Sequence, residues 1–229
     1  QKIIMQLIEN VIIPLLPLFI LGIFAKMSFS GQVFSILSVF ISIIGVIFAL
    51  HVLLLLLQYS IAGLVTKKNP FKLLITMMPA YFTALGTQSS AATIPVTLEQ
   101  ALKNGISEKI AGFVIPLCAT IHLSGSIMKI TACAMALMIL YGMPFGFTLF
   151  AGFIFVLGIA MIAAPGVPGG AIMAAVGILQ SMLGFNEEMI GIMIALYIAM
   201  DSFGTACNVT GDGAIAIVMD KVTKEKLVA

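Results

Sequence analysis

The sequence contains few charged residues and no arginine. Only 9% of its 229 residues are charged and 61% are hydrophobic, proportions far outside those of soluble globular proteins. All 11 basic residues are lysines, the net charge is +2 and no polybasic run occurs, so nucleic acid is not expected as a partner. Three cysteines lie in apolar segments without a CxxC spacing, which argues against disulfides and zinc; they are Cys118, Cys133 and Cys207. The composition predicts an integral membrane protein.

Hydrophobic segments make up most of the chain. A spanning helix needs roughly 20 apolar residues, and six segments reach or approach that length: 3–25, 34–65, 110–141, 147–164, 171–184 and 189–219. All lysines except Lys129 lie at or beyond segment ends, as in aqueous loops. The positive-inside rule would place the turn at residues 67–72 and the Lys-rich tail on the cytoplasmic side, although Lys103 and Lys109 also favour that side. The chain begins with Gln and has no cleavage-site pattern, so we expect it to be the C-terminal part of a longer protein.

Two segments read as re-entrant hairpins. The stretch 69–104 has two arms of about 15 residues, too short for a ~30 Å hydrocarbon core, joined by a polar tip at residues 86–90. Asn69 followed by Pro70 predicts the start of a helix, with Asn69 as its N-cap. A helix over 108–141 follows, with "HLSGS" near its middle, and the order then repeats with a hairpin over 143–185 and a helix over 188–221. Interrupted segments at matching positions of two halves indicate a transporter binding site. We expect an all-α integral membrane fold in which the hairpin tips and polar helix middles meet away from lipid.

The second polar helix middle reads "DSFGTACNVTGD". Asp201, Thr205, Asn208 and Asp212 follow one another at steps of four, three and four, so they share one face of a continuous helix. An ionisable side chain in lipid costs at least about 2.5 kcal/mol, which favours a functional role over hydrogen bonds that only hold a bundle together. Glycines at 204 and 211 would let another backbone approach, or let the helix unwind and expose carbonyl oxygens beside Asp212, which would suit Na⁺.

The hairpin tips offer backbone groups. Ser89 and Ser90 precede an arm whose first N–H groups are free to bind a carboxylate, unless the tip is only a capped turn. The tip "APGVPGG" has the flexible backbone of a gate, unless Pro165 and Pro168 make a static kink.

The first polar helix middle contains an unusual lysine. His122, Ser126 and Lys129 follow at steps of four and three, and Lys129 lies roughly 20 Å of helix from either end. A buried lysine is costly unless it is neutral or paired, so we expect a function for it rather than snorkelling to an interface. His51 is expected to be a core residue.

These segments resemble the dicarboxylate/amino acid:cation symporters, which include the glutamate transporter homologues. "GTQSSAATIPVTLEQA" is similar to the family's serine-rich first hairpin tip, "GVPGGAIM" to its second tip and "DSFGTACNVTGD" to its last-helix pattern D-x-x-R-T-x-x-N-V-T-G-D. The resemblance covers essentially the whole chain. It implies a scaffold helix at 1–27, a transport domain at 31–229 with its first helix at 31–66, four missing N-terminal helices and a homotrimer for the full-length protein in the cell membrane.

The resemblance also implies a set of binding residues. Asp201 would hold the α-amino group of a small-molecule substrate and Asn208 its carboxylate, helped by the hairpin tip at Ser89 and Ser90 and by Ser126. Gly204 and Thr205 would line the same pocket, with the gate at Val167 and Gly170. One sodium would bind the Asp212 carboxylate and backbone oxygens of Cys118, His122 and Asn208. A second would bind between Thr120, Leu123, Ile162 and Ala164.

Departures from the family pattern bear on the substrate and the ions. Gly204 stands where members for acidic substrates carry Arg, and Gln88 stands where some carry a hairpin Arg, so the sequence favours a neutral amino acid. Alternatively, Lys129 would meet the acidic group of a dicarboxylate or acidic amino acid. "HLSGS" replaces the family's N-M-D-G-T and removes side-chain ligands of one sodium. We therefore hypothesise that Lys129 or protonated His122 replaces that ion, with fewer coupled Na⁺ or with H⁺ instead or in addition.

Two other classes of function fit less well. An intramembrane serine hydrolase would need His122 to reach Ser124, yet side chains two residues apart on a helix point about 200° apart. A passive anion channel would show sustained conductance without substrate. We expect a cation-coupled secondary active transporter that works by alternating access, and not an enzyme.

Overall fold

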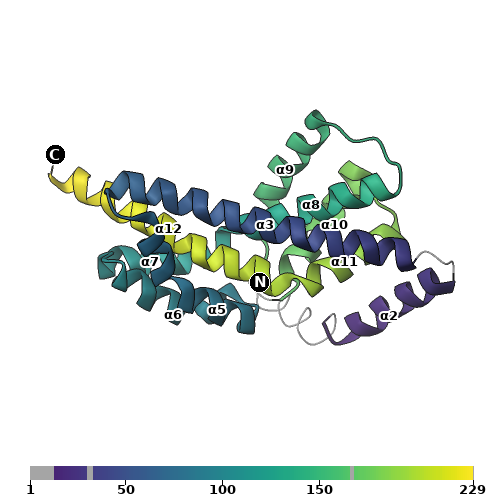
Figure 1. Ribbon diagram of the computed structural model, residues 1–229, viewed down its shortest axis with the longest axis horizontal. Coiled ribbons are helices and arrows are strands. Elements are labelled where there is room, and N and C mark those ends of the chain that lie inside the picture. The colour runs from purple at the N-terminus through teal and green to yellow at the C-terminus, as the bar shows by residue number, and fades with distance from the viewer. Residues whose placement is uncertain (1–12, 30–32, 166–167, 229) are drawn as a thin grey trace. The chain divides into compact units, whose positions relative to one another are not determined.

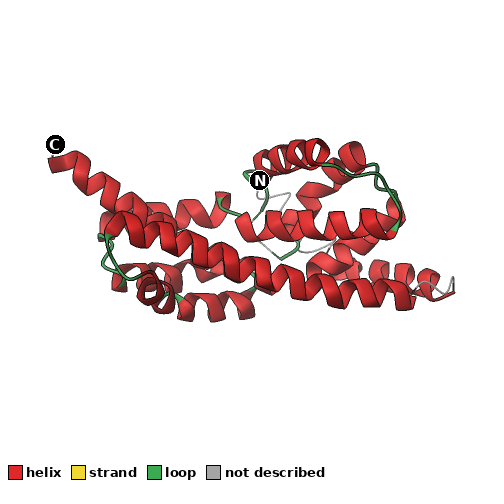
Figure 2. Ribbon diagram, turned by 45° about the horizontal axis from the view of Figure 1, so that its top comes forward, coloured by secondary structure: helices red, strands yellow, loops and turns green. Residues whose placement is uncertain are grey.

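The computed structural model describes residues 13–29, 33–165 and 168–228, and every regular element among them is an α-helix (Figures 1 and 2). The predicted all-α class is confirmed. In chain order the helices are α2 (Ile13–Phe29), α3 (Val33–Thr66), α4 (Pro70–Thr76), α5 (Met78–Thr87), α6 (Ser90–Lys103), α7 (Glu108–Ile121), α8 (Ser124–Leu140), α9 (Phe147–Met161), α10 (Gly170–Leu183), α11 (Glu187–Ala199) and α12 (Asp201–Val228).

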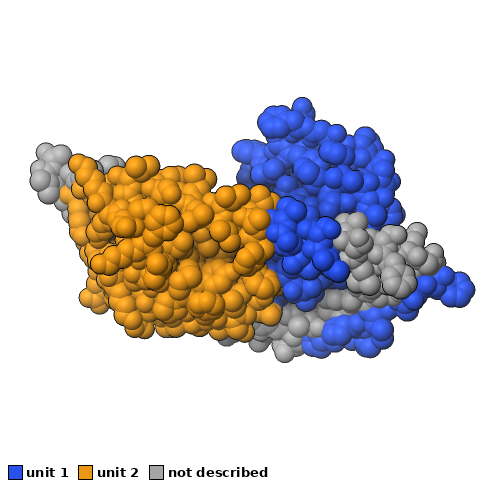
Figure 3. Space-filling model, viewed as in Figure 1, with its two compact units in different colours: residues 1–47, 127–200 blue, residues 48–126, 201–229 orange. Residues whose placement is uncertain are grey.

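The chain forms two compact units (Figure 3). Unit 1 comprises residues 1–47 and 127–200, and unit 2 comprises residues 48–126 and 201–229. Within the described ranges, two stretches are long and apolar enough to cross a membrane, Phe40–Thr66 and Glu108–Leu140. Glu187–Ala199 together with Asp201–Lys224 would make a third as a broken span. The predicted scaffold helix at 1–27 and transport domain at 31–229 are defined by which part moves during transport, and compactness does not test that division. They remain a prediction.

Unit 1 is built around α11. Its residues from Met189 to Tyr197 are apolar on all sides of the helix, and every one of them is buried, as expected of a helix enclosed by others. Helices α2 and α10 pack against it, and α10 also packs against α9. These last two are the predicted arms of the second hairpin. Gly170 begins α10, and a Cβ there would overlap the Pro165 carbonyl, so the backbones at Pro165 and Gly170 approach closely.

Unit 2 is built around α12, against which α5, α6 and α7 pack. The predicted cap at Asn69 is confirmed, because its Oδ1 accepts hydrogen bonds from Phe71 N at 2.9 Å and Lys72 N at 3.3 Å. Helices α5 and α6 pack against each other as the arms of the first hairpin. This hairpin therefore lies along the helix that carries the polar pattern.

The ends of the first hairpin are joined by a buried asparagine. At the break between α4 and α5, Met77 N bonds to Leu74 O at 2.9 Å, one residue nearer than in a regular helix. Leu73 O instead accepts from Asn104 Nδ2 at 3.0 Å, and Asn104 O accepts from Lys68 Nζ at 2.9 Å. The side chain and carbonyl of Asn104 thus tie the last residues of the hairpin to its beginning.

Both predicted long helices are divided in the structure. The stretch 108–141 forms α7 and α8 with a break at His122 and Leu123, and the stretch 188–221 forms parts of α11 and α12 with Met200 between them. At the first break His122 is extended (φ −99°, ψ 95°), so the backbone leaves the helical region there. The polar sequence "HLSGS" therefore marks a change in backbone path as well as in chemistry.

Candidate functional site

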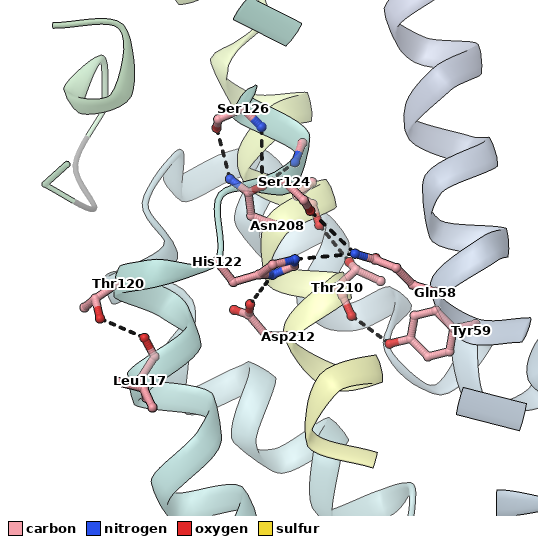
Figure 4. Close-up of polar contacts among 12 residues, drawn as sticks. Gln58, Tyr59, Leu117, Thr120, His122, Ser124, Ser126, Asn208, Thr210 and Asp212 are labelled. Atoms are coloured by element: carbon pink, nitrogen blue, oxygen red, sulfur yellow. Dashed lines mark hydrogen bonds and ion pairs between the residues drawn. The ribbon is translucent and has the colours of Figure 1, made fainter. Parts of the chain in front are cut away.

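The break between α7 and α8 is where the polar side chains of unit 2 gather (Figure 4). Backbone groups exposed by a broken helix must find partners when lipid replaces water. Here they find them on both sides, because α12 and α3 each direct polar side chains at residues 122–126. The break is consequently a junction at which α3 and α12 bond to the facing ends of α7 and α8.

Asn208 of α12 caps the beginning of α8. Its Oδ1 accepts from Gly125 N at 2.8 Å and from Ser126 N at 3.4 Å, and its Nδ2 donates to Ser126 Oγ at 3.0 Å. These are first-turn N–H groups, which have no partner within their own helix. A side chain from a distant segment thus does the work of an N-cap. The amide that the sequence assigns to the substrate carboxylate is bonded to the protein in this structure.

Asp212 lies one turn beyond Asn208 and is bonded to His122. Its Oδ1 accepts from His122 Nδ1 at 2.8 Å, with only 1% of the Asp212 side chain exposed. On the other ring nitrogen, His122 Nε2 accepts from Gln58 Nε2 at 3.4 Å. His122 therefore lies between Asp212 on α12 and Gln58 on α3. Gln58 Nε2 also donates to Ser124 Oγ at 3.5 Å, while Gln58 Oε1 is buried and has no hydrogen-bond partner among the described residues.

Glycines allow the backbones to come this close. A Cβ on Gly125 would lie 2.8 Å from Cys207 Cβ and 2.9 Å from Gly204 O. A Cβ on Gly211 would lie 2.7 Å from both Gln58 Oε1 and His122 Cε1. Since α12 is continuous from Asp201 onward, Gly211 serves the close approach of neighbouring groups, and the alternative of an unwound helix does not occur.

Helix α3 contributes residues that the sequence analysis missed or undervalued. His51 Nε2 donates to Gly125 O at 3.0 Å, so the expected core histidine also holds the break in place. Tyr59 OH donates to Thr210 O at 2.7 Å on α12. Gln58 was missed altogether. Its signal was an amide after five consecutive leucines, seven residues beyond His51 and thus on the same face of the helix.

The polar face predicted on α12 lies in the interior. Asp201, Thr205, Asn208 and Asp212 are between 1% and 6% exposed, and they follow one another along a single helix. Ser126 is also buried, and it belongs to the same unit as these four residues. Unit 2 therefore holds these five predicted substrate and sodium residues, and all five are buried.

The first hairpin tip has the geometry of a capped turn. Gln88 is left-handed (φ 53°), and Ser89 is the N-cap of α6, with its Oγ accepting from Ala92 N at 3.3 Å. Ser90 is buried, and the Thr87 and Thr93 hydroxyls bond to each other at 2.8 Å. Ser89 and Ser90 thus lie in unit 2 at the end of the hairpin that packs on α12.

The first predicted sodium site has suitable oxygens, several of which are already engaged. The Asp212 carboxylate and main-chain carbonyls are hard donors of the kind that hold Na⁺ in discontinuous helices. In this structure one carboxylate oxygen bonds to His122, and Cys118 O accepts from His122 N at 2.8 Å. The Asp212 carboxylate and the carbonyls of Cys118, His122 and Asn208 would hold the ion. His122 bonds to only one carboxylate oxygen of Asp212, so the other oxygen would bind the ion.

The second predicted sodium site remains a prediction. Thr120 and Leu123 belong to unit 2, whereas Ile162 and Ala164 belong to unit 1. Thr120 Oγ1 donates to Leu117 O at 2.7 Å, and Ile162 is 60% exposed. Of the predicted gate, Gly170 lies at the start of α10, and Val167 lies outside the described residues.

Lys129 has no exposed surface, in agreement with its predicted depth. It lies in α8 within unit 1, where Nζ donates to Tyr197 O and to Met200 O, each at 3.3 Å. Contrary to the prediction, His122 does not share one face of a continuous helix with Ser126 and Lys129. His122 lies in the break, and α8 begins only at Ser124.

Comparisons with known proteins identify the family. Residues 1–222 match the model of the sodium:dicarboxylate symporter family. Excitatory amino acid transporter 3 of Mus musculus is 34% identical over 181 residues, covering 78% of this chain and 34% of that protein. Excitatory amino acid transporter 1 of Rattus norvegicus is 32% identical over 192 residues, covering 81% of this chain and 33% of that protein.

This chain spans about a third of the length of these relatives. The match is to membrane transporters and not to enzymes, which removes the support for a serine hydrolase, and the apolar helices agree with a multi-pass membrane protein. The identity to the relatives and the family match over nearly the whole sequence lead to one conclusion: the chain belongs to the sodium:dicarboxylate symporter family.

Proposed function

We propose that the protein containing this chain is a sodium-coupled symporter for a small neutral amino acid, working by alternating access. The observation that carries the proposal is the buried polar face of α12, formed by Asp201, Thr205, Asn208 and Asp212. Buried carboxylates in a membrane protein mark substrate or ion sites by default, because their burial is costly unless a ligand or partner compensates it. The family name supports sodium as the coupled ion.

The roles we assign follow the chemistry of the side chains. Asp201 binds the ammonium group of the substrate, and Asn208 together with the tip at Ser89 and Ser90 binds its carboxylate. Asp212 and nearby main-chain carbonyls bind Na⁺. In the structure Asn208 is bonded to Ser126 and to the first turn of α8, so substrate binding would exchange some of these hydrogen bonds for bonds to the carboxylate.

We propose a substrate with a neutral side chain, because this sequence contains no arginine that could bind an acidic side chain of the substrate. The relatives are named for excitatory amino acids, but Gly204 occupies the position on α12 where a guanidinium would bind a side-chain carboxylate. Lys129, the other candidate for that role, donates to the Tyr197 and Met200 carbonyls. Both observations favour alanine or serine over aspartate.

Uptake by the full-length protein in proteoliposomes tests this proposal. Labelled serine, alanine and aspartate are supplied under an inward Na⁺ gradient and, separately, under an inward H⁺ gradient. We expect serine or alanine uptake driven by Na⁺. Robust aspartate uptake would contradict the neutral substrate, and uptake driven by H⁺ alone would contradict sodium coupling.

A matched pair of variants locates the ion site. Asp212→Asn should abolish the dependence of uptake on Na⁺, because it removes the charge that we assign to the ion. Asp220→Asn is the control, since Asp220 lies on the same helix but bonds to Ser107 Oγ at 2.6 Å and Lys224 Nζ at 2.6 Å. It should retain Na⁺-dependent uptake, so equal losses in both variants would overturn the assignment.

A further inference from the structure

Lys129 lies where a charged group needs strong compensation. It belongs to the apolar span Glu108–Leu140, and none of its surface is exposed. An isolated ammonium in such a place would be highly unfavourable, so its partners must supply negative charge or dipoles. From the sequence, this ammonium could meet a substrate or replace an ion.

Its partners in unit 1 form a ligand set typical of a monovalent cation. Nζ is 3.3 Å from Tyr197 O, 3.3 Å from Met200 O and 3.3 Å from the centroid of the Tyr197 ring. Backbone carbonyls replace water around monovalent cations in membrane proteins, and an aromatic face attracts cations by its quadrupole. The three contacts come from the last residues of one helix and the residue that follows it.

That helix lacks its own positive charge at this end. Helix α11 has Glu187 and Glu188 in its first turn but no basic residue in its last turn. Its C-terminal carbonyls carry a partial negative charge that favours a cation, and the effect is screened least when it is buried. Lys129 supplies that cation from α8.

We propose that the end of α11 is a monovalent-cation site that the Lys129 ammonium fills permanently, and that a variant without the ammonium binds a free cation there. Lys129→Met keeps the length of the side chain and removes its charge. Ammonium ion is the probe, because it matches the lost group in size, charge and hydrogen-bond donors. The site includes the Tyr197 and Met200 carbonyls and the Tyr197 ring.

The test measures thermal unfolding of the full-length protein in detergent, in choline chloride and in ammonium chloride at equal ionic strength. In choline the midpoint of Lys129→Met should fall by about 4 °C or more relative to the parent. Ammonium should recover most of that loss with a saturable concentration dependence, because it binds only the folded state. The parent and the control Lys109→Met, which removes an exposed lysine, should respond little to ammonium.

Several results would overturn the proposal. Lys129→Met could be as stable as the parent in choline, or it could be destabilised with no difference between the two salts. If Lys129→Met folds in neither salt while Lys129→Arg folds, a free cation cannot replace the tethered one. Because the readout is stability in ammonium, a failure of sodium-driven uptake leaves this test unaffected.

Discussion

Gly125 lies where α3, α8 and α12 come close together, and a larger residue would not fit there. Its N–H bonds to Asn208, its carbonyl accepts from His51, and a Cβ would press on Cys207 and the Gly204 carbonyl. The sequence predicted Asn208, Asp212 and Lys129 as buried functional candidates from their polarity, their spacing along a helix and their depth within apolar segments. It could not predict the closeness of Gly125 to Cys207, because these residues are far apart in the sequence and meet only after α12 packs against the break.

Replacing Gly125 by Ala should destabilise the full-length protein by about 1–3 kcal/mol. The added methyl group would lie too close to Cys207 Cβ and to the Gly204 carbonyl oxygen, so α8 and α12 would have to move apart. Gly112→Ala is the control: it lies in α7, no described neighbour lies within 4 Å of the position that the added methyl group would take, and alanine is the better helix former. Thermal unfolding of both variants in lipid nanodiscs measures the difference. A Gly125→Ala variant as stable as Gly112→Ala would contradict the close contact.

The first hairpin shows how much of an element can be predicted from sequence. Its short arms, its polar tip and the cap at Asn69 followed from length, polarity and the Asn-Pro pair. The break between α7 and α8 was harder, because Leu123 continues the apolar pattern through it and hydropathy does not report backbone angles. The tie from Asn104 to Leu73 was also hidden, because it depends on how the two ends of the hairpin meet.

Asn104→Ala should weaken this hairpin. The change leaves the Leu73 carbonyl without its donor, which costs about 1–3 kcal/mol when the group is buried. Lys103→Ala is the matched control, because the Lys103–Glu99 pair is 55% and 60% exposed and such pairs contribute only about 0.3–0.5 kcal/mol. Hydrogen exchange should increase in residues 70–103 of Asn104→Ala and stay unchanged in Lys103→Ala. Equal exchange in both variants would show that the tie is not needed.

At the scale of the whole molecule, the chain corresponds to about a third of its relatives. We propose, from the resemblance to the symporters, that the surface for subunit contact lies mostly outside this stretch of sequence. We therefore expect the full-length protein to be a homotrimer and the 229-residue chain alone not to form one. Native mass spectrometry from detergent, applied to both forms, measures this. A monomeric full-length protein, or a trimer of the short chain, would contradict the expectation.

The three cysteines are all buried, with exposed fractions of 6% for Cys118, 1% for Cys133 and 0% for Cys207. Water-soluble maleimides react with accessible thiolates, so these thiols should stay unlabelled in the folded protein. A single cysteine introduced at an exposed position such as Phe147, which is 90% exposed, would then carry a fluorophore or spin label with little background. Such a label could be attached to this chain without first removing any of its three native cysteines.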